Sequence, residues 1–309
     1  MSFRILRASK DDHEMKKVTV YLMGGLGNQL FQYHLGLSLC KSQNRRLILV
    51  DCSRHASYNR KNEEGIRALD VSVSGRIVMN SLRELVLRRI INSLKYSWAR
   101  SFFSKVGFVF STDKQHFNEI SSKKRNLRLA GYFQSFSLVK DMIGSNIEIK
   151  NPTKWYLETR QLLKKEKPIA LHIRRGDYLQ HAKTMGVLDL KYFEESLSDI
   201  LKNQQSERSV WIFTDSDSAA IEFREKIMKI NVKVRVVSPP GDSQAAESLL
   251  LMSLCNEIVI SNSTYSWWAA VLGSAEKRVI RPSHWFRNLA EPEDLFPKNW
   301  IVQDSVWLD

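Results

Sequence analysis

Apolar and polar residues alternate along the second half of the chain with two different periods. Short apolar runs predict buried strands, and the segments between them carry apolar side chains at helical spacing. The predicted strands cover residues 169–173, 210–214, 232–237, 258–260 and 279–280. The predicted helices cover residues 190–200, 218–228, 244–255 and 265–272. Repeated strand–helix alternation is typical of a doubly wound parallel sheet.

The first half of the chain opens with a similar pattern. An apolar run at residues 18–23 predicts a buried strand, and three glycines within residues 24–27 predict a tight turn after it. Asn28 can cap the helix that follows, and residues 47–50 predict a second strand. Strand, turn, helix and strand form a βαβ unit, so we expect a second parallel sheet here. A further strand is expected at 127–133.

Residues 76–105 are strongly basic and harder to assign. They carry seven Lys or Arg residues against one acid, Glu84. The apolar residues that recur every four positions are Leu82, Val86, Ile90, Leu94 and Trp98. This spacing predicts a helix with one apolar stripe. We expect the stripe to pack on its own domain, and the alternative is a helix that lies on anionic lipid.

The length of 309 residues favours two domains, at roughly 100–200 residues per domain. Asn151 and Pro152, together with the polar stretch before Pro168, predict the break between them. We therefore expect one α/β domain at 1–160 and another at 161–309.

Composition and charge narrow the class of partner. The chain is 43% hydrophobic and 26% charged, which is ordinary globular composition. Its net charge of +14 predicts an anionic partner: a nucleic acid, an anionic lipid or a phosphorylated substrate. The three cysteines, Cys40, Cys52 and Cys255, suit buried thiols in a reducing compartment. Residues 1–17 lack the apolar core of a signal peptide, and no run reaches ~18 apolar residues, so we expect a cytoplasmic protein.

The first candidate binding segment is the glycine turn at residues 24–29, GGLGNQ. Open α/β sheets bind ligands outside the carboxyl ends of their strands, where this turn is expected. Gly25 and Gly27 permit close backbone approach, and Asn28 and Gln29 begin a helix whose free N–H groups attract anions. The alternative is a purely structural turn, and the pattern alone leaves both open.

The second candidate segment is HIRRGDY, from His172 to Tyr178. Arg174 and Arg175 directly follow a predicted strand, and two guanidiniums there can clamp a diphosphate through forked, charge-assisted hydrogen bonds. The alternative is a surface ion pair with Asp177. The position at a strand end favours anion binding.

The third candidate segment joins a predicted strand to a helix and consists of Ser261, Asn262, Ser263 and Thr264. Their hydroxyls and the free helix N–H groups can cradle a phosphate. Alternatively, Ser263 or Thr264 only caps the helix, and the following Trp267 and Trp268 belong to the core. The two interpretations fit together if the tryptophans pack while the polar turn touches the ligand.

Asp215 and Asp217 follow the predicted strand at 210–214 and form an Asp-x-Asp pair. Carboxylates one residue apart can share Mg²⁺ or Mn²⁺, as in metal-dependent nucleotide-sugar enzymes. We prefer a structural interpretation, in which Asp217 caps the next helix and Asp215 braces the basic segment.

Together these segments resemble the inverting α-1,2-fucosyltransferases of glycosyltransferase family 11. The resemblance rests on residues 24–33 (GGLGNQLFQY), 131–135 (GYFQS), 172–178 and 261–270, which follow in family order. It implies two Rossmann-like domains of the GT-B type, with the acceptor on the N-terminal side, GDP held mainly by the C-terminal half, and no metal. The implied donor is GDP-β-L-fucose, and the implied product is an α-1,2-linked fucoside, usually on galactose.

The resemblance also implies roles for single residues. Arg174 would hold the β-phosphate with Arg175 in support, and Asp177 is the nearest candidate for the general base, unless it only braces the arginines. The remaining implied contacts are Asn28, Gln29, Ser261, Asn262 and Ser263. Bacterial members commonly modify lipid-linked glycans, so a lipid-linked acceptor and peripheral contact with the anionic inner membrane face are further expectations.

Two other classes account for parts of the sequence. A metal-dependent transferase of the GT-A type would be built on Asp215 and Asp217. A nucleic-acid-binding protein would explain the net charge, but the sequence has no helix-turn-helix, zinc or RNP motif, so we expect no nucleic-acid partner.

Overall fold

The computed structural model describes residues 16–51, 65–71, 73, 75–78, 86, 89, 97–105, 107–110, 126–202, 207–227, 232–240 and 245–308. The chain divides into two compact units. The second unit consists of Gly25–Leu30, Asn62–Val71 and Gln134–Asp309, and the first contains the other residues up to Phe133. Helix α1 (Leu26–Gln43) begins in the second unit and continues in the first. The domain boundary expected at residue 160 stays a prediction.

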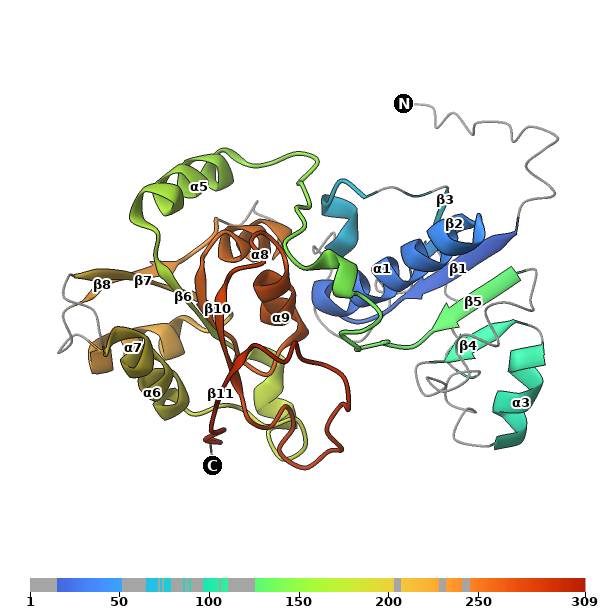
Figure 1. Ribbon diagram of the computed structural model, residues 1–309. Coiled ribbons are helices and arrows are strands. Elements are labelled where there is room, and N and C mark those ends of the chain that lie inside the picture. The colour runs from blue at the N-terminus through green and yellow to red at the C-terminus, as the bar shows by residue number, and fades with distance from the viewer. Residues whose placement is uncertain are drawn as a thin grey trace. The chain divides into compact units, whose positions relative to one another are not determined.

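The first unit is built on a five-stranded sheet in the order β3-β2-β1-β5-β4, in which every described strand pair is parallel. Its strands are β1 (Lys17–Leu22), β2 (Arg46–Asp51), β3 (Gly75–Val78), β4 (Phe108–Phe110) and β5 (Asn126–Ala130). Successive side chains of β1 point to opposite faces of the sheet. Val20 packs on Gly36 of α1, and Tyr21 stacks on Phe108. Phe103 of α3 (Ser97–Lys105) contacts the same Phe108 ring, so both faces are covered (Figure 1).

The second unit is built on a six-stranded sheet in the order β11-β10-β9-β6-β7-β8, again parallel throughout the described pairs. Its strands are β6 (Ile169–Ile173), β7 (Arg208–Thr214), β8 (Val232–Val237), β9 (Glu257–Val259), β10 (Arg278–Pro282) and β11 (Ile301–Gln303). Its α-helices are α5 (Lys154–Glu166), α6 (Leu190–Leu201), α7 (Asp217–Ile227), α8 (Ala245–Ser253) and α9 (Thr264–Val271). Its 3₁₀ helices are η3 (Gly65–Ala68), η5 (Lys140–Met142) and η6 (Gly176–His181).

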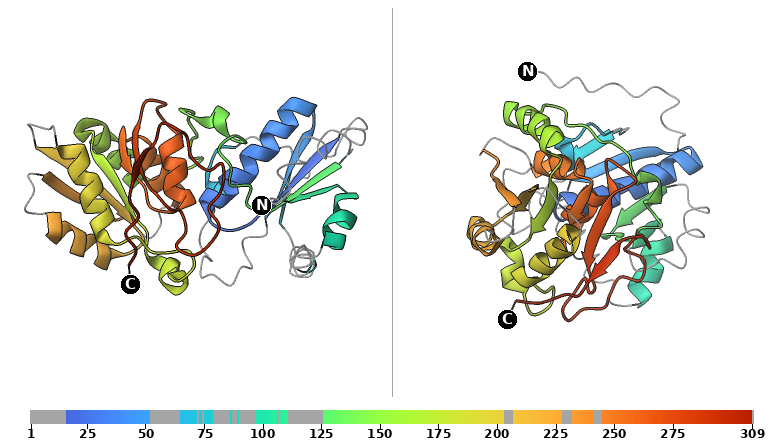
Figure 2. Two further views of the ribbon diagram at one scale, coloured as in Figure 1. Left: turned by 60° about the horizontal axis from the view of Figure 1, so that its bottom comes forward. Right: turned by 60° about the vertical axis from the view of Figure 1, so that its left-hand side comes forward.

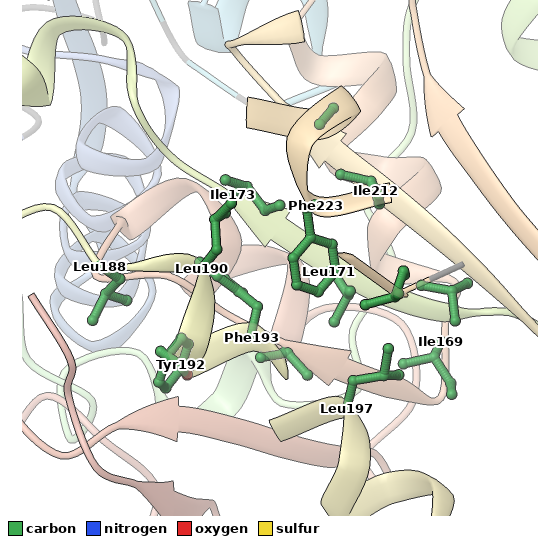
Figure 3. Packing of buried hydrophobic residues seen from close by; sticks show 14 of the residues in the cluster. Ile169, Leu171, Ile173, Leu188, Leu190, Tyr192, Phe193, Leu197, Ile212 and Phe223 are labelled. Carbon is green, nitrogen blue, oxygen red and sulfur yellow. The ribbon is translucent and has the colours of Figure 1, made fainter. Parts of the chain in front are cut away.

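Helices cover both faces of this second sheet, as Figures 1 and 2 show. On one face, Phe193 of α6 and Phe223 of α7 pack on Leu171 of the central strand β6 (Figure 3). On the other face, Trp211 donates its indole N–H to Glu166 of α5 at 2.8 Å, α8 packs beside α5, and α9 packs beside α8. Burial on both faces explains why the central strand β6 is a continuous apolar run in the sequence.

The strand order of the second sheet reverses between β6 and β9. From β6 the chain winds through β7 to β8, then returns to β9 on the other side of β6 and continues to β10 and β11. Ligands of open α/β sheets bind at such a switch point, outside the carboxyl ends of the strands. The segments that follow β6 and β9 are therefore the ones placed to bind a ligand.

Two sequence-based expectations about helices are wrong. Helix α1 begins at Leu26, so Asn28 lies inside its first turn and not at its cap. Val86 and Trp98, the described members of the apolar stripe, are 53% and 67% exposed and are not core residues. The other stripe members, Leu82, Ile90 and Leu94, lie outside the described residues.

The structure also describes two of the three cysteines and the length and hydropathy of the helices. Cys40 and Cys255 are buried free thiols, as predicted, and Cys52 lies outside the described residues. In the part of the chain that the structure describes, no helix is long and apolar enough to cross a membrane.

Candidate active site

Arg174 lies at the switch point, one residue beyond the end of β6. Its guanidinium pairs with Asp177, and its Nη1 lies 2.6 Å from Asp215 Oδ2. The Tyr178 ring lies 5.1 Å from Arg174 Cζ, a cation–π contact. The Arg174 side chain remains 18% exposed, and its buried Nε donates to no acceptor among the described residues. Arg174 therefore presents a positive group with unused donors at the edge where ligands are expected.

Arg175 faces the opposite way and is buried. Its guanidinium donates to the carbonyl oxygen of Leu188, and its side chain is only 6% exposed. Burial lowers the pKa of this guanidinium below its ordinary value. The predicted clamp of two neighbouring guanidiniums is thus not formed. Arg175 contributes to the site through its backbone N–H, which donates to Asp215.

Asp215 connects the ends of β7 and β6. Its Oδ1 accepts from the backbone N–H of Arg175 at 2.8 Å, and its Oδ2 pairs with Arg174. This is the bracing role that we preferred from the sequence. The helix cap differs, because Ser216 Oγ accepts from the Ala219 N–H at 3.4 Å, whereas Asp217 is already the first residue of α7. Among the described residues, no group of three or more His, Cys, Asp or Glu side chains is placed to hold a metal ion.

The third segment is tied directly to the second. His172 Nδ1 lies 2.8 Å from Ser261 Oγ, and the Tyr178 hydroxyl donates to the Asn262 carbonyl at 3.1 Å. The Asn262 side chain, 1% exposed, donates to three backbone carbonyls, those of Met185, Gly186 and Trp285. Ser261 and Asn262 therefore hold the turn together, and their side chains face inward.

Ser263 and Thr264 form the start of α9. Ser263 is the N-cap, and its side chain accepts from the Tyr265 N–H at 3.4 Å. Thr264 is half-buried, while Trp267 and Trp268 are fully buried, as expected from the sequence. The first turn of α9, which follows β9 at the switch point, thus has a structural cap and the backbone N–H groups of a helix start.

The glycine turn contributes its backbone to the second unit. A methyl group at Gly27 would lie 2.5–2.6 Å from backbone atoms of Thr264 and Tyr265, so only glycine allows the start of α1 to approach the start of α9. Asn28 Oδ1 accepts from Gln134 at 2.9 Å, and Gln29 Oε1 accepts from the Ile66 N–H at 3.0 Å. The polar side chains of this motif therefore position neighbouring loops.

Sequence reasoning gave no role to Tyr178 or Gln32, although both lie inside the recognised motifs. Tyr178 contacts Arg174 with its ring and Asn262 with its hydroxyl. In the first unit, Gln32 Oε1 accepts from the Met23 N–H at 3.0 Å and its Nε2 donates to the Gly131 carbonyl at 2.9 Å. Their presence in the motifs could have indicated a role for them. The residues that they contact are brought near them only by the fold.

The electrostatics of the site are set by burial as well as by charge. Burial first, and the charge of Arg174 second, lower the pKa of His172 to about 3. His172 is therefore neutral at physiological pH and acts through a hydrogen bond. Around Arg174 the two neighbouring carboxylates leave one more negative than positive charge.

Two doubly wound parallel sheets, with an arginine at the switch point of the second, are the arrangement of the GT-B glycosyltransferases. The sequence model of Glycosyl transferase family 11 matches residues 4–304, and the chain belongs to this family. The family assignment made from the motifs is confirmed, and neither alternative class is favoured by the match.

Similar proteins agree with this assignment. The O-antigen biosynthesis glycosyltransferase WbnK of Escherichia coli is 27% identical over 290 residues, which cover 86% of this chain and 93% of that protein. The alpha-1,2-colitosyltransferase of Escherichia coli is 25% identical over 296 residues, or 93% of this chain and 99% of that protein. A crystal structure of NodZ alpha-1,6-fucosyltransferase soaked with GDP-fucose has a TM-score of 0.50 at 14% identity, covering 90% of this chain and 100% of that chain, and supports the fold alone.

Proposed function

We propose that this glycosyltransferase moves L-fucose from GDP-β-L-fucose to the 2-hydroxyl of a galactose residue, with inversion at the anomeric carbon. Membership of family 11 supports glycosyl transfer. The NodZ structure was soaked with GDP-fucose, which supports the donor class, and the name alpha-1,2-colitosyltransferase supports the linkage. That same name makes colitose the competing donor sugar.

The observation that carries this proposal is the placement of Arg174 at the switch point between β6 and β9. Breaking the bond between fucose and phosphate builds negative charge on the leaving GDP. A guanidinium that binds the β-phosphate more strongly as this charge grows stabilises the transition state more than the ground state. Asp215 and Tyr178 hold Arg174 in place for this role.

The remaining predicted contacts fall into two groups. Thr264 and the backbone N–H groups at the start of α9 complete the phosphate site in this proposal, and Gly25 and Gly27 let the α1 backbone come close. A second group supports these contacts from behind through the hydrogen bonds described above. Its members are Asn28, Gln29, His172, Arg175, Ser261, Asn262 and Ser263.

The acceptor hydroxyl must lose a proton during inversion, and Asp177 is the general base that we propose. Its side chain is 25% exposed and lies beside the proposed phosphate contact, Arg174. No metal is required in this scheme, because Asp215 already bonds to Arg174 and to the Arg175 N–H and so is engaged away from a cation.

The proposed acceptor is a galactose-containing glycan, and a lipid-linked carrier is the form that we favour. The name O-antigen biosynthesis glycosyltransferase, borne by WbnK, supports a glycan acceptor. Such an acceptor would place the enzyme in the cytoplasm with peripheral contact at the inner membrane face.

The proposal is tested by measuring GDP release from GDP-fucose in the presence of galactose-terminated acceptors and EDTA. We expect acceptor-dependent release that survives EDTA and falls by roughly 10²- to 10³-fold in Arg174→Ala, the loss typical of removing one transition-state donor. Arg224→Ala, a change at an exposed position on α7, is the matched control and should leave the rate unchanged. Release that requires Mn²⁺ would move the site to Asp215 and Asp217 and contradict the proposal.

A further inference from the structure

The sheet of the first unit has a switch point of its own, at the ends of β1 and β5. Its strand order β3-β2-β1-β5-β4 places β2 and β3 on one side of β1, and the later strands β4 and β5 on the other. The parallel strands β1 and β5 lie side by side (Figure 1). Ligands of open α/β sheets bind outside the carboxyl ends of the strands at such a point. The segments that follow β1 and β5 are therefore candidates for a second binding site.

These two segments are residues 23–24, after β1, and residues 131–133, after β5. The buried side chain of Gln32 joins them, because it accepts from the Met23 N–H at 3.0 Å and donates to the Gly131 carbonyl at 2.9 Å. Neither segment carries a charged side chain, whereas the segment after β6 carries two arginines and an aspartate. The switch point of the first unit therefore suits a neutral ligand better than a phosphate.

Tyr132 lies between two residues with unusual backbone angles. Gly131 has φ of +146°, and Phe133 has φ of +50°, which is strained for a bulky side chain. Phe133 is only 4% exposed, whereas Tyr132 is 48% exposed. Tyr132 also has an interaction within the protein, and 48% is the fraction that stays exposed beside it. Backbone strain that buries one aromatic residue and exposes its neighbour is of the kind that clusters at ligand-binding sites.

An exposed aromatic residue at an uncharged site suits a sugar. The face of an aromatic ring is negative and attracts the weakly positive hydrogens of C–H groups. Galactose carries its axial 4-hydroxyl on one face of the ring, so the C–H groups of C3, C4 and C5 gather on the other face. A galactose residue that lies with this apolar face on Tyr132 keeps its 2-hydroxyl at the rim of the ring, where it is open to reaction.

We propose that the switch point of the first unit is the acceptor site, and that the galactose ring stacks on Tyr132. The proposal rests on the proposed function in taking a galactose residue as the acceptor. It adds a source of specificity, because the equatorial 4-hydroxyl of glucose moves the C4 hydrogen to the other face and breaks up the apolar patch. Tyr132 thus selects acceptors with the galactose configuration.

Rates of GDP release in EDTA, with acceptor and donor concentrations varied in turn, test the kinetic consequence. Tyr132→Ala should raise the KM for a galactose-terminated acceptor by about tenfold, the scale of one lost aromatic contact, and leave the donor KM unchanged. Tyr132→Phe keeps the ring and should resemble the wild type. Phe102→Ala is the matched control, because it removes an aromatic residue that is 58% exposed on α3, outside both segments, and should change neither KM.

Proton NMR of methyl β-galactoside, titrated with the full chain, measures the stacking itself. An aromatic ring beneath the sugar shifts the signals of H3, H4 and H5 upfield. We expect this shift with the wild type and with Tyr132→Phe, its loss with Tyr132→Ala, and a smaller shift for methyl β-glucoside. If thermal unfolding shows that Tyr132→Ala is not folded, Tyr132→Leu keeps an apolar side chain without a ring and should give the same loss.

An unchanged acceptor KM in Tyr132→Ala, an equal rise in its donor KM, or no upfield shift with the wild type would overturn this proposal while leaving the proposed function in place. Failure of the wild-type protein to release GDP with any galactose-terminated acceptor would overturn both together.

Discussion

Two neighbouring arginines show how strongly position decides the role of a residue. Arg174 and Arg175 are chemically identical and adjacent, yet the turn that follows β6 places their side chains in different surroundings. Arg174 keeps an exposed edge between two carboxylates, whereas Arg175 is buried against the Leu188 carbonyl. Substituting Arg175 would therefore disturb the turn after β6, while substituting Arg174 removes a contact that we assign to the donor.

At the same scale, His172 should make folding stability depend on pH. Its pKa is about 3 in the folded protein, and so is that of the buried His34, against 6.5 in the unfolded chain. The unfolded chain thus binds protons that the folded protein does not, and stability falls as the pH drops below 6.5. By linkage we expect a loss of about 2 kcal/mol per histidine between pH 7 and pH 5.

Urea unfolding of the wild type and of His172→Asn at both pH values checks this expectation. The asparagine variant keeps a hydrogen-bonding group for Ser261 but does not titrate, so its loss of stability should be about half that of the wild type. An equal loss of stability in both proteins would show that folding does not lower the pKa of His172.

At the scale of elements, the approach of α1 to the start of α9 depends on Gly27. Gly27→Ala would place a methyl group 2.5–2.6 Å from backbone atoms of Thr264 and Tyr265, which cannot rotate away. We expect the free energy of unfolding to fall by about 1–3 kcal/mol and transferase activity to fall with it. Gly75→Ala is the control, because its methyl group would meet only an Ile48 carbon at 4.0 Å and should change stability by less than about 0.5 kcal/mol. Unchanged stability in Gly27→Ala would contradict the observed contact.

The sequence predicts the elements that have a clear apolar pattern and misses those that are short or exposed. Residues 169–173 agree with β6 at both ends, because a continuous apolar run marks a fully buried parallel strand. Residues 232–237 agree with β8 at both ends, because alternating apolar and charged residues mark a strand with one buried face. Strand β4 (Phe108–Phe110) is too short to show a period. Helix α5 buries only Tyr156 and Leu163, so its apolar stripe is weak.

The candidate site could be predicted only as a set of segments. The motifs pointed to Arg174 and to the turn after β9, and both lie at the switch point. The bond between Asp215 and Arg174 depends on the register of β7 against β6, which is a property of the sheet. The inward turn of Arg175 and the loop contact of Gln29 with Ile66 likewise depend on residues far away in the sequence.

At the scale of the whole molecule, the net charge of the chain and the charges around Arg174 affect ligand binding in different ways. The chain carries a net charge of +14, which raises the local concentration of anionic ligands. Salt screens this attraction beyond about 8 Å under physiological conditions, so selection of the donor falls to the residues in direct contact. Around Arg174 the two carboxylates of Asp177 and Asp215 outnumber the one positive charge. General attraction therefore brings anions to the surface, and the residues that contact the ligand directly distinguish among them.

The central claim is the transfer of fucose, with inversion, to the 2-hydroxyl of galactose. The most direct measurement is the NMR spectrum of the product formed from GDP-β-L-fucose and a galactose-terminated oligosaccharide in EDTA. We predict an α-configured fucose attached to O2 of the galactose. A β-configured fucose, attachment at another hydroxyl, or transfer of colitose but not fucose from its GDP donor would contradict this account.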